Sequence, residues 1–467
     1  MIRFDDYSFS YGSDVKEQGI RNINISIEKG ECVLFCGASG CGKTTLLRSV
    51  NGIIPHMMEG VSLGKVYVDD QDVSDIEMYE LSKLVSSVFQ NPKSQFFNTD
   101  VESEIVFSLE NQGVDIPVIE ERLRYTMETL KIQSLAGRSM FELSGGEKQQ
   151  VAFAGAYISS APIIILDEPT ANLDPEAIVK IRGILTKMKE AGKTILISEH
   201  RLWWLKDLVD RVFFMRDGGI ERELSGSDFF CMDENEREEL GLRELEQVTA
   251  SKGKSDHTPE HVRGRKVLEI SDLTLAYKKQ IVQHNLNFYV YEGEILGITG
   301  VNGAGKTTLL RALAGLSKQK TGTISMNGKE ASAKFRRRHF GMVMQDANYQ
   351  LFADSCENEC MLGNPDVDEN KATELLKEAM LEKLNERHPQ SLSGGQKQRL
   401  ALAVCKASQK DILLLDEPTS GLDYQSMLAV RDVLSGLASE GKTIIVVTHD
   451  REFIELVCDR TIELKKA

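Results

Sequence analysis

The chain has 467 residues, of which 41% are hydrophobic and 27% are charged, and its formal net charge at pH 7 is −15. This length suits two globular domains of roughly 200 residues each. No apolar run in the sequence approaches the ~20 residues that span a bilayer, and the acidic balance opposes binding to nucleic acid, which requires a basic surface. We therefore expect a cytoplasmic protein, with any membrane-spanning segments supplied by other subunits.

A glycine-rich segment is the first chemical element along the chain. It reads GASGCGKT at residues 37–44, and a second copy reads GVNGAGKT at residues 300–307. Both match the phosphate-loop pattern G-x-x-x-x-G-K-[ST], in which backbone N–H groups surround a phosphate, the lysine reaches the β- and γ-phosphates and the hydroxyl binds Mg²⁺. Tyr11 and Tyr277 close strand-like openings, where an aromatic ring can stack on adenine or pack against an edge. The residues predicted to bind ATP in these loops are Gly37, Ala38, Ser39, Gly40, Cys41, Gly42, Lys43, Thr44 and Thr45 in the first half, and Gly300, Val301, Asn302, Gly303, Ala304, Gly305, Lys306, Thr307 and Thr308 in the second, with Thr44 and Thr307 as Mg²⁺ ligands.

A glutamine follows each phosphate loop in a similar aromatic context. Gln90 lies in VFQNPKSQFF (88–97), and Gln345 lies in VMQDANYQLF (343–352). A neutral amide can touch both a metal-bound water and a neighbouring subunit, so we predict that both glutamines act at the ATP sites and contribute to the Mg²⁺ shell. The apolar residues that end these segments are predicted to be exposed for contact with a partner, with core packing as the alternative, and they are Phe96, Phe97, Leu351 and Phe352.

An LSGG tetrad comes next in each half, as LSGGE at residues 143–147 and LSGGQ at residues 392–396. Charged, leucine-bearing stretches precede the tetrads at residues 114–137 and 367–386. This composition favours helices. We predict a helical insertion ahead of each tetrad.

An apolar run that ends in D-E-P-T follows each tetrad, as IIILDEPT and ILLLDEPT. Such short runs, rich in branched residues, are typical of strands buried on both faces of a parallel sheet. A carboxylate at the end of such a strand can hold Mg²⁺, and the next carboxylate can orient and deprotonate the attacking water. A histidine after the last buried strand is placed to contact the γ-phosphate. The predicted roles are Mg²⁺ ligand for Asp167 and Asp416, general base for Glu168 and Glu417, and γ-phosphate contact for His200 and His449.

The order and spacing of these motifs form a tandem repeat. Glu168 and Glu417 are 249 positions apart, so the repeating unit is a whole domain. Helical segments stand between the short buried runs, which predicts an α/β fold with a mainly parallel central sheet in each half. We predict two tandem P-loop NTPase domains at residues 1–222 and 267–467. An acidic helix and a flexible tether are predicted between them, at residues 223–266.

Together these motifs resemble those of the ATP-binding subunits of ABC transporters, with two nucleotide-binding domains fused, over nearly the whole chain. The resemblance implies ATP and Mg²⁺ as ligands. It also implies that the two halves pair within one chain, so that each ATP site combines the phosphate loop of one half with the LSGG segment of the other. The implied partners of Lys43 are Ser393, Gly394, Gly395 and Gln396, and those of Lys306 are Ser144, Gly145 and Gly146.

The glutamine segments and the sequence NGIIPHMMEG resemble energy-coupling factor transporters, which import vitamins and metal ions. This resemblance implies an integral membrane coupling subunit and a substrate-capture subunit as partners, no nucleic acid, and a peripheral position on the cytoplasmic face of the membrane. Two alternatives stay open. One is a twin-cassette ATPase that acts on ribosomes or DNA, which the acidic balance disfavours. The other is a sugar-importer ATPase, which usually carries one degraded site.

Two positions depart from the family pattern in the first half. Glu147 stands where the family usually has glutamine, and Gln150 stands where the second half has Arg399. Both lie in the segment predicted to serve the ATP of the second half. We therefore expect two competent but unequal sites.

Overall fold

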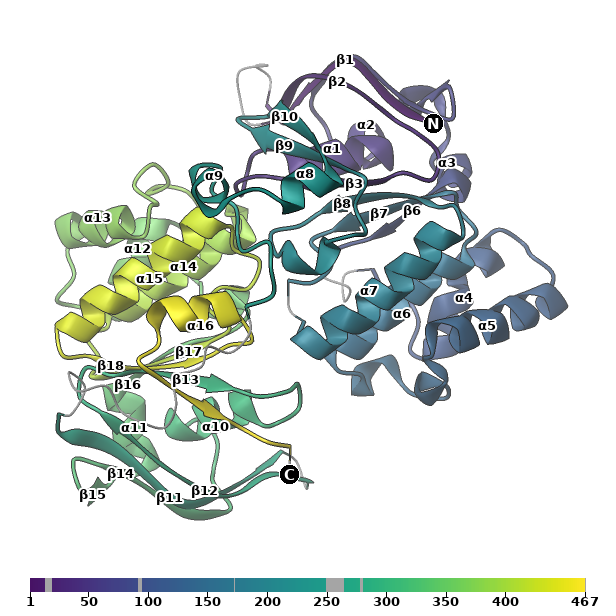
Figure 1. Cartoon of the computed structure of the whole chain (residues 1–467). Helices are drawn as coiled ribbons and strands as arrows, with labels where there is room; N and C mark the ends of the chain where they lie inside the picture. The colour runs from purple at the N-terminus through teal and green to yellow at the C-terminus, as the bar shows by residue number, and fades with distance from the viewer. Residues whose placement is uncertain (13–18, 91–94, 172, 249–263, 278–279, 467) are drawn as a thin grey trace. The chain divides into compact units, whose positions relative to one another are not determined.

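The computed structural model divides the chain into two compact units, Met1–Gln247 and Val248–Ala467 (Figure 1). Each unit combines an antiparallel sheet, a mainly parallel sheet and helices, so the predicted α/β architecture with two tandem domains is confirmed. The described residues are 1–12, 19–90, 95–171, 173–248, 264–277 and 280–466.

The mainly parallel sheet is the central layer of the first unit. Three of its strands, Cys32–Cys36, Ile163–Asp167 and Thr194–Ser198, are almost completely buried, as expected of strands covered on both faces. In β3 (Cys32–Cys36), Val33 and Phe35 contribute to one core cluster, while Leu34 contributes to the other. This alternation is the period of two expected of a strand. In spatial order the strands are β10 (Gly219–Ser225), β9 (Arg211–Arg216), β3, β8 (Thr194–Ser198), β7 (Ile163–Asp167) and β6 (Val85–Val88), with β10 antiparallel to β9 and the others parallel.

An antiparallel sheet and α1 (Lys43–Val50) cover one face of that layer, and the larger helices cover the other. The antiparallel strands, in spatial order, are β2 (Gly19–Ile27), β1 (Ile2–Ser10), β4 (Val61–Val68) and β5 (Gln71–Asp72). The remaining helices up to the last strands are α2 (Ile53–His56), α3 (Met78–Leu84), α4 (Val101–Asn111), α5 (Ile116–Leu130), α6 (Gly145–Ile158) and α7 (Pro175–Glu190), with short 3₁₀ turns at Val73–Asp75, Gln133–Leu135, Met140–Glu142 and Trp203–Leu205.

The helical insertion of the first unit is larger than the predicted stretch 114–137. It contains α5 as expected, but it begins earlier with α4, which Asp100 caps by accepting a hydrogen bond from Ser103 N at 2.9 Å. The apolar residues of α4 and α5 pack in the same core cluster as α6 and α7. The insertion therefore shares one core with the tetrad helix α6.

The first unit also extends beyond the predicted boundary at residue 222. The segment after β10 forms α8 (Gly226–Phe230) and α9 (Glu234–Glu239), and Leu240, Leu242 and Leu245 are buried in the main core of the unit. These leucines bury apolar surface that outweighs the acidic composition on which the linker assignment depended. The predicted acidic helix is present, but it belongs to the first unit. The predicted flexible tether, residues 249–263, lies outside the described residues.

The second unit repeats the same layers. In the strand that precedes its phosphate loop, Leu296 and Ile298 contribute to one core cluster, and Ile295 contributes to the other. Its parallel strands, in spatial order, are β16 (Phe340–Val343), β17 (Ile412–Asp416), β18 (Thr443–Val447), β13 (Ile295–Thr299) and β19 (Arg460–Glu463), and its antiparallel strands are β12 (Gln280–Tyr291), β11 (Lys266–Tyr277), β14 (Thr321–Met326) and β15 (Lys329–Glu330). Its helices are α10 (Lys306–Leu313), α11 (Ala333–His339), α12 (Cys356–Met361), α13 (Glu369–Glu378), α14 (Gly394–Ala407), α15 (Tyr424–Ser439) and α16 (Arg451–Val457), with 3₁₀ turns at Ala347–Tyr349 and Pro389–Ser391.

The stretch 367–386 is the predicted insertion of the second unit, and it contains α13. As in the first unit, a further helix (α12) precedes it and packs in the same core cluster. Within the described residues, no helix is both long enough and apolar enough to cross a membrane.

Candidate functional site

Each phosphate loop connects a buried strand to the first helix of its unit. Gly42, the residue before α1, has φ 104°, and Gly305 before α10 has φ 87°, a left-handed conformation that favours glycine. Lys43 Nζ donates hydrogen bonds to the carbonyl oxygens of Gly37 and Ala38, both at 3.0 Å. Each lysine thus lies over its own loop, and the helix behind it begins with backbone N–H groups that can bind a phosphate.

The loop threonines meet the carboxylates that end the D-E-P-T strands. Thr44 Oγ1 donates to Asp167 Oδ1 at 3.1 Å, and Thr307 makes the equivalent hydrogen bond to Asp416. Burial, followed by the charge of Glu168, raises the pKa of Asp167, and burial also raises the pKa of Asp416. A buried carboxylate beside a hydroxyl, next to a phosphate loop, is a set of oxygen ligands that fits Mg²⁺.

Glu168 and Glu417 leave the strands in an unusual backbone conformation. Their φ angles are 45° and 50°, in the left-handed region that side chains other than glycine rarely adopt. The N–H of Glu168 is held by Ser198 O at 2.9 Å, and that of Glu417 by Val447 O at 2.8 Å. Strain of this kind persists where surrounding contacts fix it, and it is common at functional sites.

In the first unit, Glu168 meets both the glutamine and the histidine. Gln90 Nε2 donates to Glu168 Oε2 at 2.7 Å. His200 Nε2 lies 3.4 Å from Glu168 Oε1. This nitrogen is buried and has no hydrogen-bond partner among the described residues, so it fits a ligand oxygen such as that of a γ-phosphate.

In the second unit the histidine also contacts the phosphate loop. His449 Nε2 lies 2.9 Å from Lys306 Nζ and 3.0 Å from Asn302 Oδ1. It lies 3.5 Å from Glu417 Oε1. Loop, strand-end glutamate and histidine therefore converge in this unit. Gln345 is exposed at the same end of the sheet.

The two tyrosines predicted to stack on adenine are both accessible. Tyr11 is 42% exposed and Tyr277 is 59% exposed. The Tyr11 hydroxyl lies 2.9 Å from Thr45 Oγ1, which places it beside the helix that follows the phosphate loop. The Tyr11 ring also packs edge-to-face against Phe9, with the ring centroids 5.0 Å apart.

Each LSGG segment begins a helix with the same cap. Ser144 and Glu147 form a capping box at the start of α6, and Ser393 and Gln396 form one at the start of α14. The departure at position 147 therefore keeps the cap and changes only the charge. Arg138 Nη1 lies 2.6 Å from Glu147 Oε1. Although burial raises the pKa of Glu147, the Ser144 N–H and Arg138 lower it below its usual value overall.

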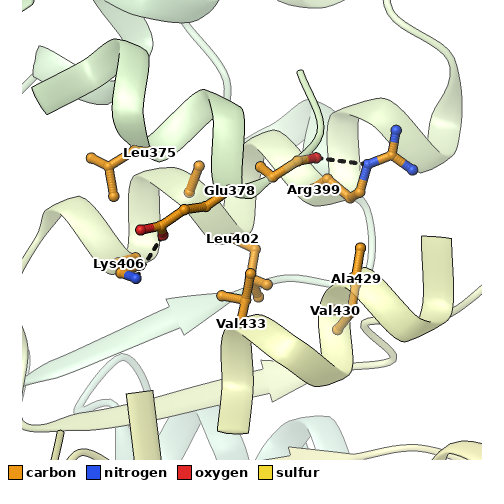
Figure 2. Close-up of a pocket in the computed structure, with 10 residues that line it drawn as sticks. Leu375, Glu378, Arg399, Leu402, Lys406, Ala429, Val430 and Val433 are labelled. Carbon is orange, nitrogen blue, oxygen red and sulfur yellow. Dashed lines mark hydrogen bonds and ion pairs between the residues drawn. The ribbon is translucent and has the colours of Figure 1, made fainter. Parts of the chain in front are cut away.

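The second departure changes how the helix is anchored. Arg399 Nε donates to Ala379 O at 3.0 Å (Figure 2). Its Nη1 donates to the Ser426 hydroxyl, so one side chain ties α14 to the end of α13 and to α15. A small cavity lies beside Arg399, and Lys406 and Glu378, which also line it, form an ion pair at 2.6 Å (Figure 2). Gln150 is shorter and uncharged at the equivalent position of α6.

In the segments that contain Gln90 and Gln345, backbone N–H groups donate to side chains that were not predicted from the sequence. Gln95 Oε1 accepts from Phe89 N at 3.0 Å, and Gln350 Oε1 accepts from Met344 N at 2.7 Å. Glu359 Oε2 accepts from two N–H groups, of Phe352 at 2.7 Å and of Ala353 at 2.6 Å, and Glu104 Oε2 does the same for Phe97 and Asn98. The sequence does contain a signal for these contacts, because Glu104 follows Gln95 by nine positions and Glu359 follows Gln350 by nine positions.

The predicted surface at the end of these segments is partly wrong. Phe97 is 75% exposed and Phe352 is 76% exposed, as expected. Leu351, however, is 4% exposed and belongs to the core of the second unit, and Phe96 packs partly buried against the core of the first. In each segment, therefore, the first of the two apolar residues packs against the core and the second is exposed. Residues 91–94 of the first segment lie outside the described residues.

Comparison with known proteins gives a consistent result. A family model described as "ABC transporter" matches residues 20–171 and 283–420. A Treponema denticola protein provisionally named ABC transporter ATP-binding protein is 46% identical over 99% of this chain and 95% of its own length. A Bacillus subtilis protein provisionally named HMP/thiamine import ATP-binding protein YkoD is 31% identical over 99% of this chain and 90% of its own. The structure titled "Model of ribosome-bound archaeal Pelota and ABCE1" covers 98% of this chain and 76% of that chain, with a TM-score of 0.69 and 23% identity, which is a likeness of fold.

Proposed function

Because the chain belongs to the ABC transporter family and carries two of its ATP-binding cassettes, we propose that it is the ATP-hydrolysing subunit of an energy-coupling factor importer. Members of this family are ATPases that bind ATP with Mg²⁺. The proposed cargo is a vitamin, a vitamin precursor or a metal ion. The relative YkoD, which is named for import of thiamine or HMP, supports a vitamin or its precursor.

The observation that carries the proposal is the exposed aromatic ring after each glutamine segment. Phe97 and Phe352 are about three-quarters exposed, at 75% and 76%, and their N–H groups are fixed by glutamates of the insertion helices. Exposed aromatic side chains on a fixed backbone are typical anchors of protein interfaces. Gln90 connects the first of these segments directly to Glu168. A partner bound there would therefore respond to the state of the ATP site.

The proposed chemistry uses the groups that converge in each unit. Lys43 and Lys306 hold the phosphates, and Glu168 and Glu417 accept a proton from the attacking water. His200 Nε2, which makes no hydrogen bond within the described residues, donates a hydrogen bond to an oxygen of the γ-phosphate. Bound Mg²⁺ would supply charge compensation for the phosphates at the aspartate and threonine oxygens.

Two glycines support a site shared between the halves. A Cβ built at Gly145 or Gly394 would meet no heavy atom of the described chain within 4 Å. Both residues are the first residue of their helices, where alanine would be the better helix former by about 1 kcal/mol. Neither position requires glycine for its own unit. We infer that each leaves room for the nucleotide bound by the other half.

The proposed partners are an integral membrane coupling subunit and a substrate-capture subunit, with the chain peripheral on the cytoplasmic face of the membrane. Fractionation of cells that express a tagged chain tests this assignment against the ribosomal alternative. We expect the tag in detergent-solubilised membranes together with an integral membrane protein. Recovery in ribosomal fractions, with none in membranes, would contradict the proposal.

Changing both exposed rings tests the coupling surface. In the Phe97→Ser, Phe352→Ser double variant we expect basal ATPase activity within about twofold of wild type, but a weaker hold on the membrane. Truncation of one interface anchor costs about 2 kcal/mol, roughly 30-fold in affinity. The measurement is the membrane-bound fraction of the chain. Ile116→Ser, which changes a 72% exposed residue of α5, is the control. Equal membrane recovery for the double variant and the control would place the coupling surface elsewhere.

The two sites are expected to contribute unequally to turnover. The tetrad helix proposed to serve Lys43 has a neutral Gln396 and the Arg399 anchor, whereas the helix proposed to serve Lys306 has an acidic residue at its first turn, Glu147. A negative side chain in the first turn of a helix takes up part of the attraction of that helix end for a phosphate, an effect of about 0.3–1 kcal/mol. Glu168→Gln alone should therefore lower steady-state ATP hydrolysis about two- to fivefold more than Glu417→Gln alone. Equal losses, or the reverse order, would remove the basis for the asymmetry.

A further inference from the structure

The residues that flank the two histidines differ reciprocally between the units. The first unit reads Ser198-Glu199-His200-Arg201, and the second reads Val447-Thr448-His449-Asp450. Strand pairing fixes the equivalence, because Asp167 pairs with Ser198 and Asp416 pairs with Val447. The carboxylate thus stands one position before the histidine in the first unit and one position after it in the second.

Each carboxylate binds the threonine of the D-E-P-T segment in its own unit. Thr170 Oγ1 donates to Glu199 Oε2 at 2.5 Å, and Thr419 Oγ1 donates to Asp450 Oδ2 at 2.8 Å. All four residues are buried, with exposed fractions of 4% or less. A hydrogen bond from a buried hydroxyl to a buried carboxylate is expensive to break, because each group would be left without a partner.

The first-unit carboxylate also holds the backbone of the histidine segment. Glu199 Oε1 accepts from His200 N at 2.8 Å and from Arg201 N at 3.1 Å. Burial raises the pKa of Glu199, and the donors around it oppose that rise. Arg201 Nη1 in turn donates to Leu173 O at 3.0 Å. Glu199 therefore holds the Thr170 hydroxyl and the N–H groups of His200 and Arg201, and the Arg201 side chain holds the Leu173 carbonyl.

The exchange alters the surroundings of the strand-end glutamate. In the second unit, Thr448 Oγ1 and His449 N both donate to Glu417 Oε2, at 2.9 and 3.2 Å. In the first unit the equivalent N–H, of His200, is taken by Glu199. In that unit Glu168 Oε2 accepts from Gln90 Nε2 at 2.7 Å, and His200 Nε2 lies 3.4 Å from Glu168 Oε1.

We propose that Glu199 and Asp450 are positioning residues of the two ATP sites. Each carboxylate ties the segment that carries the histidine to the threonine of the D-E-P-T segment, from before the histidine in the first unit and from after it in the second. The inference rests on the proposed roles of Glu168 and His200.

Transplanting the second-unit residues into the first unit tests this proposal. Glu199→Thr removes the acceptor of the Thr170 hydroxyl, and we expect kcat for ATP hydrolysis by the whole chain to fall about tenfold. The KM for ATP should change less than about twofold, because the phosphate loop is untouched. Adding Arg201→Asp supplies a carboxylate where Asp450 stands. The Glu199→Thr, Arg201→Asp double variant should return kcat to within about threefold of wild type, a coupling that independent sites would not give.

Each single change alone should lower kcat, since Arg201→Asp by itself sets two carboxylates beside one threonine. The proposal is wrong if Glu199→Thr leaves kcat unchanged, or if the double variant is no more active than the weaker single variant. Melting temperatures identify variants that fail to fold. Glu199→Gln keeps the side-chain volume, so it replaces Glu199→Thr if the latter unfolds, with the same expected fall in kcat at constant KM.

Failure of this inference can be told apart from failure of the proposed roles. If Glu168→Gln with Glu417→Gln leaves hydrolysis intact, the roles of the glutamates are wrong. If that pair abolishes hydrolysis while the Glu199 variants keep wild-type kcat, only the positioning by Glu199 is wrong.

Discussion

Replacement of Glu168 and Glu417 together by glutamine is expected to lower the rate of ATP hydrolysis by roughly 10²–10⁴ while ATP stays bound. Glutamine keeps the size and the hydrogen-bonding reach of the side chain but cannot take a proton from water. The phosphate loops and their lysine contacts, such as Lys43 to Gly37 O at 3.0 Å, are untouched by the change. The measurements are kcat by phosphate release and ATP affinity by equilibrium binding.

Exposed glutamates in the insertion helices provide the control for that pair. Glu120→Gln in α5 and Glu369→Gln in α13 make the same chemical change away from the candidate sites, and they should hydrolyse ATP at the wild-type rate. Near-normal hydrolysis by the Glu168→Gln, Glu417→Gln variant would overturn the assignment of the general bases. Loss of ATP binding in that variant would also contradict it, because the effect would then be structural.

The second large effect is expected from adding one methyl group to each LSGG segment. Gly145→Ala with Gly394→Ala should lower ATP hydrolysis by about 10², the scale on which loss of one phosphate-facing donor acts. Stability should not fall, because a Cβ at either position meets no heavy atom of the described chain within 4 Å and alanine favours a helix by about 1 kcal/mol over glycine. Activity and melting temperature would therefore move independently or in opposite directions.

Two other helical glycines match these positions sterically. A Cβ at Gly183 in α7 or at Gly436 in α15 would likewise meet nothing within 4 Å in the described chain. Gly183→Ala with Gly436→Ala should keep wild-type hydrolysis and gain the same helix stability. If the LSGG pair also keeps wild-type hydrolysis, the glycines do not face a nucleotide, and the shared site loses its main support.

The local motifs were the part of the molecule that the sequence could predict. A phosphate loop or a strand-end carboxylate depends on neighbours within a few residues, and the repeat showed each motif twice. The contacts of Gln90 with Glu168 and of Thr44 with Asp167 follow from that order once the strands are parallel. The α/β layers also followed, because fully apolar five-residue runs such as Cys32–Cys36 are stable only as strands that are buried on both faces.

The errors arose where long-range packing overrides composition. Acidic residues 233–246 suggested a linker, but Leu240 and its neighbours reach the core of the first unit. Leu351 stands beside an exposed ring and is nevertheless buried. The threonine contacts of Glu199 and Asp450 join residues 29 and 31 positions apart, and no local pattern marks them. Such pairings depend on the register of β7 with β8 and of β17 with β18.

The most direct test of the account is the distance between spin labels in the two units. One pair joins Arg216, at the end of β9 beside the strand that leads to the first phosphate loop, to the exposed Gln390 just before LSGGQ. The reciprocal pair joins Glu463 in β19 to Phe141 just before LSGGE. The exposed Cys231 is replaced by serine, and Glu168→Gln with Glu417→Gln preserves bound ATP. Shared ATP sites predict that both distances shorten when ATP and Mg²⁺ are added, and distances that do not change in either pair would contradict them.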